Sequence, residues 1–282
     1  MVDLHTHSYY SDGSCSPAQL LSMAEAAGLS ALALCDHNTV AGLPEFIEAG
    51  KDSPVEAVPG VELSTEYQGT ELHILGLFLQ PAHFEAVNAL MEDFCSRKER
   101  SNRALAQALR QAGLDIDYDA VRAGANGFVN RAHFAAELTR KGYTASPQEA
   151  FQKYLSPKRG LYTPPQRLDA YDAIAFIKSL GAVAVLAHPF LNLDGQRLRA
   201  FLPEALERGL DGMEVLYPKY DAGTTAMAEQ LAKEFGLLPS GGSDFHGQAK
   251  PDIRIGVGRG ELQVPQAFLQ ALRERRKPVK NS

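Results

Sequence analysis

Short apolar runs of strand length alternate with helix-like segments in both halves of this chain of 282 residues. Ala31–Leu34 and Ala182–Ala187 have the pattern of buried strands, while Ser16–Ala27 and Asp169–Leu180 have the pattern of helices. Strands that alternate with helices are typical of parallel β/α units, in which functional residues lie at the carboxyl ends of the strands. The sequence therefore predicts an α/β fold built around a parallel sheet.

This alternation is interrupted in the middle of the chain. From about His83 to Arg110 the pattern is helical, and residues 111–163 contain short helical patterns without a convincing strand. The alternation resumes near residue 169. We therefore expect a β/α barrel formed by residues 1–87 and 164–282, with a small, mostly helical insert at residues 88–163.

Composition and charge exclude several classes of protein. The net charge of −6 argues against a protein that coats nucleic acid non-specifically, but it permits a small anionic substrate in a locally positive pocket. No apolar stretch approaches the roughly 20 residues of a transmembrane helix, and the start of the chain lacks the features of a secretory signal. Three cysteines without a CxxC pair suit a reducing compartment. We expect a cytoplasmic protein without membrane contact.

Histidines and acidic residues gather at the ends of the expected strands. Imidazole and carboxylate groups together are the ligand set of divalent metals such as Zn, Mn and Fe. The residues in this pattern are His5, His7, Asp12, His37, Glu62, His73, His188, Asp244 and His246. Histidines placed at random would not recur at strand ends, so the pattern predicts a metal-dependent hydrolase.

The strongest local signal is the pair His5 and His7. In a strand, residues i and i+2 face the same side, so both imidazoles can bind one ion. Asp244 and His246 repeat this spacing after the last expected strand, Leu238–Ser240. Asp12 precedes a glycine and has two interpretations, a residue of a tight turn or a ligand beside the two histidines; we favour the ligand.

Asp36 and His37 follow a buried strand. Adjacent strand residues face opposite ways, so we expect only His37 to bind metal. Asp36 is expected to assist catalysis without binding the metal, by orienting an imidazole. Cys35 would point away from Asp36 and is not expected to be a ligand.

Glu62, His73 and His188 complete the set. Glu62 comes after the expected strand Val55–Val58, where its carboxylate is placed to bridge two ions; without this context it is an exposed charge. His73 lies in the expected strand Thr70–Leu79, where a core histidine without a metal is an equal alternative. His188 ends an apolar strand directly before a proline, which favours a ligand.

Several short motifs follow one another along the chain: H-x-H with D-G, D-H, G-x-E, a lone H, H-P and S-D-x-H. In this order they resemble the PHP (polymerase and histidinol phosphatase) domain family. The resemblance covers residues 1–80 and 165–262. It implies a distorted (β/α)7 barrel that holds two to three divalent ions, Mn, Fe or Zn. One ion would take His5, His7, Glu62 and Asp244, a second Glu62, His73 and His188, and a third Asp12, His37 and His246.

The helical insert resembles that of small PHP phosphoesterases that act on nucleoside phosphates. In that subgroup the insert covers the active site and supplies basic contacts. The segment Val129–His133 matches a phosphate-binding segment, which makes Arg131 and His133 candidate substrate contacts; the run Arg97–Arg103 adds Arg97 and Arg100. A run of charges on a helix is more often a solvated face, so these last two have an equal structural explanation.

The resemblance implies hydrolysis of phosphomonoesters, either a nucleoside monophosphate or a 3′,5′-nucleoside bisphosphate. Clustered divalent ions lower the pKa of a bound water and so provide a hydroxide nucleophile near neutral pH. Arg131 suits bidentate phosphate binding. His133, or another histidine that does not bind the metal directly, would protonate the leaving alcohol.

Three alternatives remain open. One is a histidinol-phosphate phosphatase, and another is a free-standing 5′–3′ exonuclease acting on short RNA or DNA. The third is a non-catalytic module whose metals stabilise the fold; the intact ligand set argues against it. We expect a small phosphorylated substrate, with a nucleotide favoured and short oligonucleotides as the alternative, and we expect a monomer.

Overall fold

The computed structural model describes residues 1–123 and 129–276. The chain divides into two compact units, a barrel unit formed by Met1–Ala89 with Leu168–Ser282 and a helical unit formed by Leu90–Arg167.

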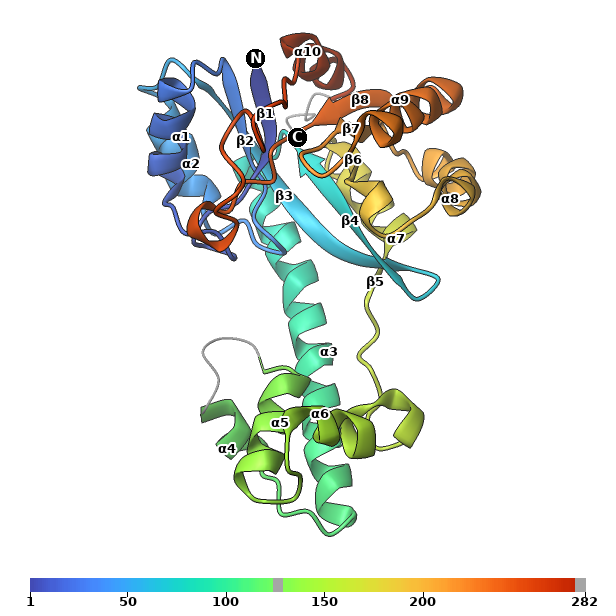
Figure 1. The fold of residues 1–282 in the computed structure, drawn as a ribbon. Coiled ribbons are helices and arrows are strands. Elements are labelled where there is room, and N and C mark those ends of the chain that lie inside the picture. Colours follow the sequence, from blue (N-terminus) through green and yellow to red (C-terminus); the bar gives the residue numbers. More distant parts are fainter. Residues whose placement is uncertain (124–128, 277–282) are drawn as a thin grey trace. The chain divides into compact units, whose positions relative to one another are not determined.

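One sheet forms the centre of the barrel unit, and it confirms the predicted α/β barrel class (Figure 1). The strand order is β1 (Val2–Thr6), β2 (Ala31–Leu34), β3 (Glu56–Tyr67), β4 (Thr70–Leu77), β6 (Val183–Ala187), β7 (Gly212–Leu216) and β8 (Leu238–Gly241). The short strand β5 (Leu168–Asp169) pairs with β3. The sheet nearly closes, because the His7 N–H donates to the Phe245 carbonyl at 2.9 Å and the Asp244 N–H donates to the His5 carbonyl at 2.8 Å.

Helices lie on the outside of this sheet (Figure 1). They are α1 (Pro17–Ala26), α2 (Leu43–Gly50), α7 (Ala170–Ser179), α8 (Gly195–Glu207), α9 (Ala222–Phe235) and α10 (Gln266–Glu274), with 3-10 turns at η1 (Pro81–His83), η4 (Pro189–Leu191) and η5 (Gly247–Ala249). Strand residues such as Leu4, Leu75 and Val185 are fully buried in one apolar core with Leu269 of α10. Burial of these side chains is the main force that holds helices on the sheet.

The prediction of a parallel sheet is wrong for β4. This strand runs antiparallel to both β3 and β6. Gln68 and Gly69, with φ of 49° and 76°, form the two-residue turn between β3 and β4. Two consecutive positive φ values are the geometry of a hairpin turn, so no crossover helix is needed between these strands.

The predicted end of the strand at Val58 is also wrong, because β3 continues to Tyr67 and places Glu62 inside it. Pro59 is the last residue of β3 that pairs with β2, and Gly60 is the first that pairs with β4. A Cβ on Gly60 would lie 2.9 Å from the Cys35 sulfur, so a residue with a side chain would clash with the neighbouring segment here. Pro59 and Gly60 therefore mark the point where pairing with β4 begins rather than the end of the strand.

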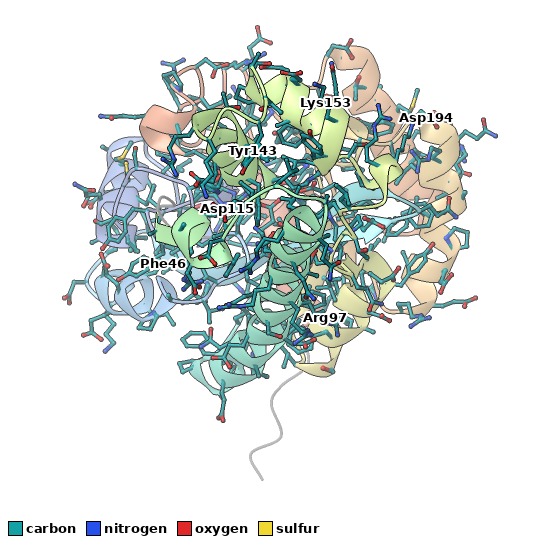
Figure 2. The ribbon with its side chains drawn as sticks, turned by 90° about the horizontal axis from the view of Figure 1, so that it is seen from below. Phe46, Arg97, Asp115, Tyr143, Lys153 and Asp194 are labelled. Atoms are coloured by element: carbon teal, nitrogen blue, oxygen red, sulfur yellow. The ribbon has the colours of Figure 1, made fainter. Side chains whose placement is uncertain are left out.

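The helical unit has its own apolar core. Its elements are most of α3 (Phe84–Gln111), α4 (Tyr118–Ala123), α5 (Arg131–Arg140), α6 (Pro147–Ala150), a π-helical turn (Phe151–Leu155) and a 3-10 turn (Pro157–Arg159). Leu105, Val121 and Phe134 are buried in this core. Asp115 and Tyr143, both labelled in Figure 2, are joined by a hydrogen bond from the Asp115 N–H to the Tyr143 hydroxyl at 2.9 Å. The helical pattern predicted from about residue 83 to 110 is confirmed, and it forms one helix, α3.

None of the helices in the described part of the chain has the length and hydropathy needed to span a bilayer.

Candidate metal centre

All nine predicted metal ligands come together in the barrel unit. They fall into four overlapping groups, in each of which the candidate ligand atoms lie within 4.8 Å of one another. The groups are His7, Asp12, His37 and His246; His5, His7 and Asp244; His37, Glu62 and His73; and His5, His188 and Glu214. The ligands come from β1, β3, β4 and the segments that follow β1, β2, β6 and β8, with Glu214 on β7.

Glu62 belongs to one of these groups, and its fully buried carboxylate faces histidines from all four. Its Oε2 atom faces three imidazole nitrogens, His5 Nε2 at 3.2 Å, His7 Nε2 at 3.3 Å and His37 Nδ1 at 3.1 Å. Its Oε1 atom faces two more, His73 Nδ1 at 2.8 Å and His188 Nε2 at 3.0 Å. A carboxylate with both oxygens surrounded by ligand nitrogens has the arrangement needed to bridge metal ions.

Backbone pairing explains how Glu62 reaches this position. The Glu62 N–H donates to the Asp36 carbonyl at 3.2 Å, and the Asn38 N–H donates to the Glu62 carbonyl at 2.9 Å. On the other side, His73 of β4 pairs with Ala187 of β6, directly before His188. The sheet register therefore brings together imidazoles that lie far apart in the sequence.

Asp12 is both a turn residue and a candidate ligand. Its Oδ1 lies 3.2 Å from His246 Nε2 and its Oδ2 lies 3.9 Å from His37 Nε2. A Cβ on the next residue, Gly13, would lie 2.4 Å from the His7 carbonyl oxygen, so the tight turn requires glycine. The turn thus brings the Asp12 carboxylate back to the histidines.

The two carboxylate oxygens of Asp244 have different neighbours: one faces the metal centre, and the other accepts hydrogen bonds from two side chains. Oδ1 lies 3.2 Å from His7 Nε2, while Oδ2 accepts hydrogen bonds from the Tyr217 hydroxyl at 2.8 Å and from Lys250 Nζ at 2.7 Å. Lys250 is partly exposed, whereas Asp244 and Tyr217 are buried. A lysine therefore touches a candidate metal ligand at the edge of the centre.

Glu214 of β7 was not among the predicted residues. It is fully buried; its Oε1 lies 3.0 Å from His5 Nδ1, and its Oε2 accepts the His188 N–H at 2.7 Å. A carboxylate on Nδ1 directs Nε2 of His5 toward the centre. The available signal was a single acidic residue inside the otherwise apolar strand Gly212–Leu216.

Asp36, predicted to orient an imidazole, lies against the loop after β1 instead. Its carboxylate accepts the Ser8 N–H at 2.7 Å, the Ser8 hydroxyl at 2.6 Å and the Ser11 hydroxyl at 2.7 Å. These bonds fix the loop that carries Asp12, so Asp36 positions that loop through Ser8 and Ser11.

The buried polar atoms of the centre fit a bound metal. Several have no hydrogen-bond partner in the described part of the chain, namely His5 Nε2, both ring nitrogens of His7, His37 Nδ1, Glu62 Oε2 and His246 Nε2. Unpartnered buried polar atoms are costly and rare, and divalent ions would satisfy these. Burial lowers the pKa of His7 to about 3, which leaves this imidazole neutral with a free lone pair. Neutral imidazole and ionised carboxylate are the forms that bind metal.

The predicted substrate contacts belong to the helical unit. The Arg131 guanidinium lies over the ring of Tyr162, with Cζ 4.7 Å from the ring centroid, and donates to the Leu155 carbonyl at 3.3 Å. His133 caps α5, because its Nδ1 accepts the Asn130 N–H at 3.0 Å. Whether these residues contact substrate stays a prediction.

The other two predicted contacts, Arg97 and Arg100, lie on α3 (Figure 2 labels Arg97). Arg97 pairs with Asp93 at 2.6 Å, and Arg100 donates to the Ser96 hydroxyl at 3.0 Å. Such pairs one turn apart are typical of a solvated helix face.

Comparison with known proteins agrees with the fold and the site. The model of the PHP domain family matches residues 3–155. A 5′–3′ exoribonuclease of Haemophilus influenzae is 37% identical over 249 residues, which cover 86% of this chain and 89% of the relative. A 3′,5′-nucleoside bisphosphate phosphatase of Chromobacterium violaceum is 30% identical over 258 residues, 90% of each chain.

A solved structure from Bifidobacterium adolescentis, assigned to the metal-dependent phosphoesterases, also resembles the chain. It superposes with a TM-score of 0.69 at 26% identity and covers 99% of this chain and 97% of its own. The chain belongs to the PHP domain family. It is an enzyme of the metal-dependent phosphoesterase class.

Proposed function

We propose that this PHP-family phosphoesterase hydrolyses a phosphomonoester of a small nucleotide, a 3′,5′-nucleoside bisphosphate or a nucleoside monophosphate. The observation that carries the proposal is the buried Glu62 carboxylate with five imidazole nitrogens within 3.3 Å of its oxygens. Two to three divalent ions, Mn, Fe or Zn, would be held by the nine predicted ligands. When bound, they supply an activated water and neutralise charge on the phosphoryl oxygens.

The chain's own residues would orient the substrate. Lys250 Nζ, which now contacts Asp244 Oδ2 and is partly exposed, is placed to share its charge with a phosphate oxygen. Tyr217 would keep Asp244 in position when Lys250 turns to the substrate, because its hydroxyl donates to the same oxygen. Hydrolysis of a phosphomonoester then needs positioning and charge stabilisation more than covalent chemistry.

The helical unit would supply further phosphate contacts. A guanidinium has five N–H donors, so the bond of Arg131 to Leu155 leaves donors for a phosphate. In neutral His133 the proton lies on Nε2, because Nδ1 accepts the Asn130 N–H. Nε2 is therefore the ring nitrogen through which we propose that His133 donates a hydrogen bond to the phosphate.

A second candidate function is the release of nucleotides from the 5′ end of short RNA. It is favoured by the 37% identity to a 5′–3′ exoribonuclease, which covers 89% of that relative. Both reactions cleave a phosphoester next to a nucleoside, so one metal centre can serve both.

The test is phosphate release by the Mn-loaded protein from a panel of adenosine 3′,5′-bisphosphate, AMP, histidinol phosphate and a 5′-phosphorylated oligoribonucleotide. Preference for the two nucleotides supports the proposal, while shortening of the oligonucleotide at a higher rate supports the second candidate. Activity on histidinol phosphate alone, or on none of the panel, contradicts both. His7→Ala should abolish activity, and His83→Gln, which changes a histidine outside the centre, should retain it.

A further inference from the structure

Two neighbouring tyrosines are exposed on the loop after β1. Tyr9 is 50% exposed and Tyr10 39%, and their rings stack with centroids 4.8 Å apart and planes 29° apart. An aromatic ring exposed to water lacks the favourable free energy of burial. A stacked pair of such rings at the surface therefore suggests that a ligand covers the pair.

The protein holds this pair in place. Both hydroxyls donate to Glu45 Oε2 of α2, from Tyr9 at 3.1 Å and from Tyr10 at 3.4 Å. The Tyr9 N–H donates to the Cys15 carbonyl at 2.9 Å, and the Tyr10 N–H donates to Ser8 Oγ at 3.2 Å. The phenol oxygens therefore already have a partner, and the ring faces are what the pair offers to a ligand.

The residues beneath the two tyrosine rings are closely packed. A Cβ on Gly42, the residue before α2, would lie 2.9 Å from Tyr10 Cδ2 and 3.0 Å from Asp36 Oδ2. Ser8 and Ser11, on either side of the tyrosines, are both fixed by Asp36. A ring pair held in this way loses little conformational entropy when a flat ligand stacks on it.

The loop that carries the pair also carries two candidate metal ligands. Tyr9 follows His7 by two residues, and Tyr10 precedes Asp12 by two residues. Two residues span at most about 7 Å of chain, so the backbone of each tyrosine is within that distance of a candidate ligand's backbone. When a phosphate lies at the centre, the base of the same nucleotide is one sugar away.

We propose that Tyr9 and Tyr10 form a stacking platform for the base of the nucleotide substrate. This inference rests on the proposed function and adds how the nucleoside is recognised. Stacking is open to every base, because each has a π face, so the platform favours nucleotides over other phosphomonoesters without selecting one base.

The experiment compares adenosine 3′,5′-bisphosphate with its abasic analogue, 1,2-dideoxyribose 3′,5′-bisphosphate. Tyr9→Leu and Tyr10→Leu should lower kcat/KM for the adenosine compound by roughly 10- to 100-fold, mainly through KM, and leave the abasic analogue unchanged. Tyr9→Phe and Tyr10→Phe are the matched controls; they retain the ring and should retain most of the preference for the base. Unchanged metal content shows that the loop still carries Asp12 correctly.

Equal losses on both compounds, or no loss on either, would overturn the platform while leaving the proposed function intact. Loss of the base preference in the phenylalanine variants as well would show that the hydroxyls, and not the ring faces, recognise the substrate, and would also overturn it. If the wild-type protein releases phosphate from neither compound, the proposed function fails and the platform fails with it.

Discussion

The carboxylate of Glu214 accepts the backbone N–H of His188 at 2.7 Å. Its other oxygen lies 3.0 Å from Nδ1 of His5, so one buried side chain on β7 contacts candidate ligands on β1 and directly after β6. His188 has φ of 27°, a left-handed value that is costly for a residue with a side chain. The hydrogen bond to Glu214 helps to hold His188 in this conformation.

Glu214→Gln should weaken metal binding without unfolding the protein. The amide keeps the size of the side chain but no longer offers two acceptor oxygens to His5 and His188. Loss of such a supporting contact typically costs about 10- to 100-fold in metal affinity. Competition with a chelator measures this affinity, and Glu229→Gln, at an exposed glutamate of α9, is the control. Equal affinity in both variants would show that Glu214 does not position the ligands.

Lys250→Ala should raise KM for the phosphorylated substrate by about 10-fold or more, as expected when a hydrogen bond to a charged group is lost. Lys250→Arg keeps the charge and should recover part of this effect. The measurement is steady-state kinetics, with Lys233→Ala on the exposed face of α9 as control. If Lys250→Ala lowers metal content and leaves KM unchanged, the lysine acts only through Asp244.

The metal-free protein should lose stability as the pH rises from about 6.5 to about 9. Against the effect of burial, the Glu62 and Glu71 carboxylates raise the pKa of His73 to about 9. Because an unfolded histidine has a pKa of about 6.5, the folded state holds an extra proton across this window, and the stability that this proton provides is lost as the pH passes the folded pKa. His5 acts in the same direction, since Glu62 and Glu214 raise its pKa despite burial.

Urea unfolding at several pH values measures this dependence. His73→Gln should reduce the slope, while His83→Gln, outside the centre, should not. A slope of opposite sign in the wild-type protein would contradict the assigned protonation of the metal-free centre.

Asp3→Ala should destabilise the barrel by about 3 kcal/mol, because it leaves buried donors without partners at about 1–3 kcal/mol each. Asp3 is fully buried and accepts the N–H groups of Ser243 at 2.8 Å, Gly256 at 2.8 Å and His5 at 3.3 Å. The bonds from Ser243 and Gly256 join β1 to the chain after β8, where the barrel closes. Urea unfolding should show a change well above that of Asp52→Ala, an exposed control; equal changes would argue against this role.

The sequence predicts most of the candidate ligand set because local spacing brings these residues together. His5 and His7 face one side through the two-residue period of a strand, and Asp12 returns to them through a turn that needs Gly13. These features depend on short stretches of chain. The barrel class follows in the same way from alternating strands and helices.

The remaining features depend on pairing between distant segments. Pro59 and Gly60 look like the end of a strand, but they mark the point where β3 begins to pair with β4. Glu214 is one acidic residue in an apolar strand, and only the register of β7 against β6 places it at His188. The cap that His133 forms on α5 was also not predicted from the sequence, because a histidine is an uncommon residue in a capping box.

The most direct test of a metal-dependent phosphoesterase centred on Glu62 is a Mn titration of the metal-free protein. Bound Mn and phosphate released from adenosine 3′,5′-bisphosphate are measured in the same samples, for the wild type and for Glu62→Gln. We predict that phosphate release rises with bound Mn in the wild type and that Glu62→Gln loses activity by more than about 100-fold together with bound Mn. Full activity of the metal-free wild type, or wild-type Mn binding and turnover in Glu62→Gln, would contradict the account.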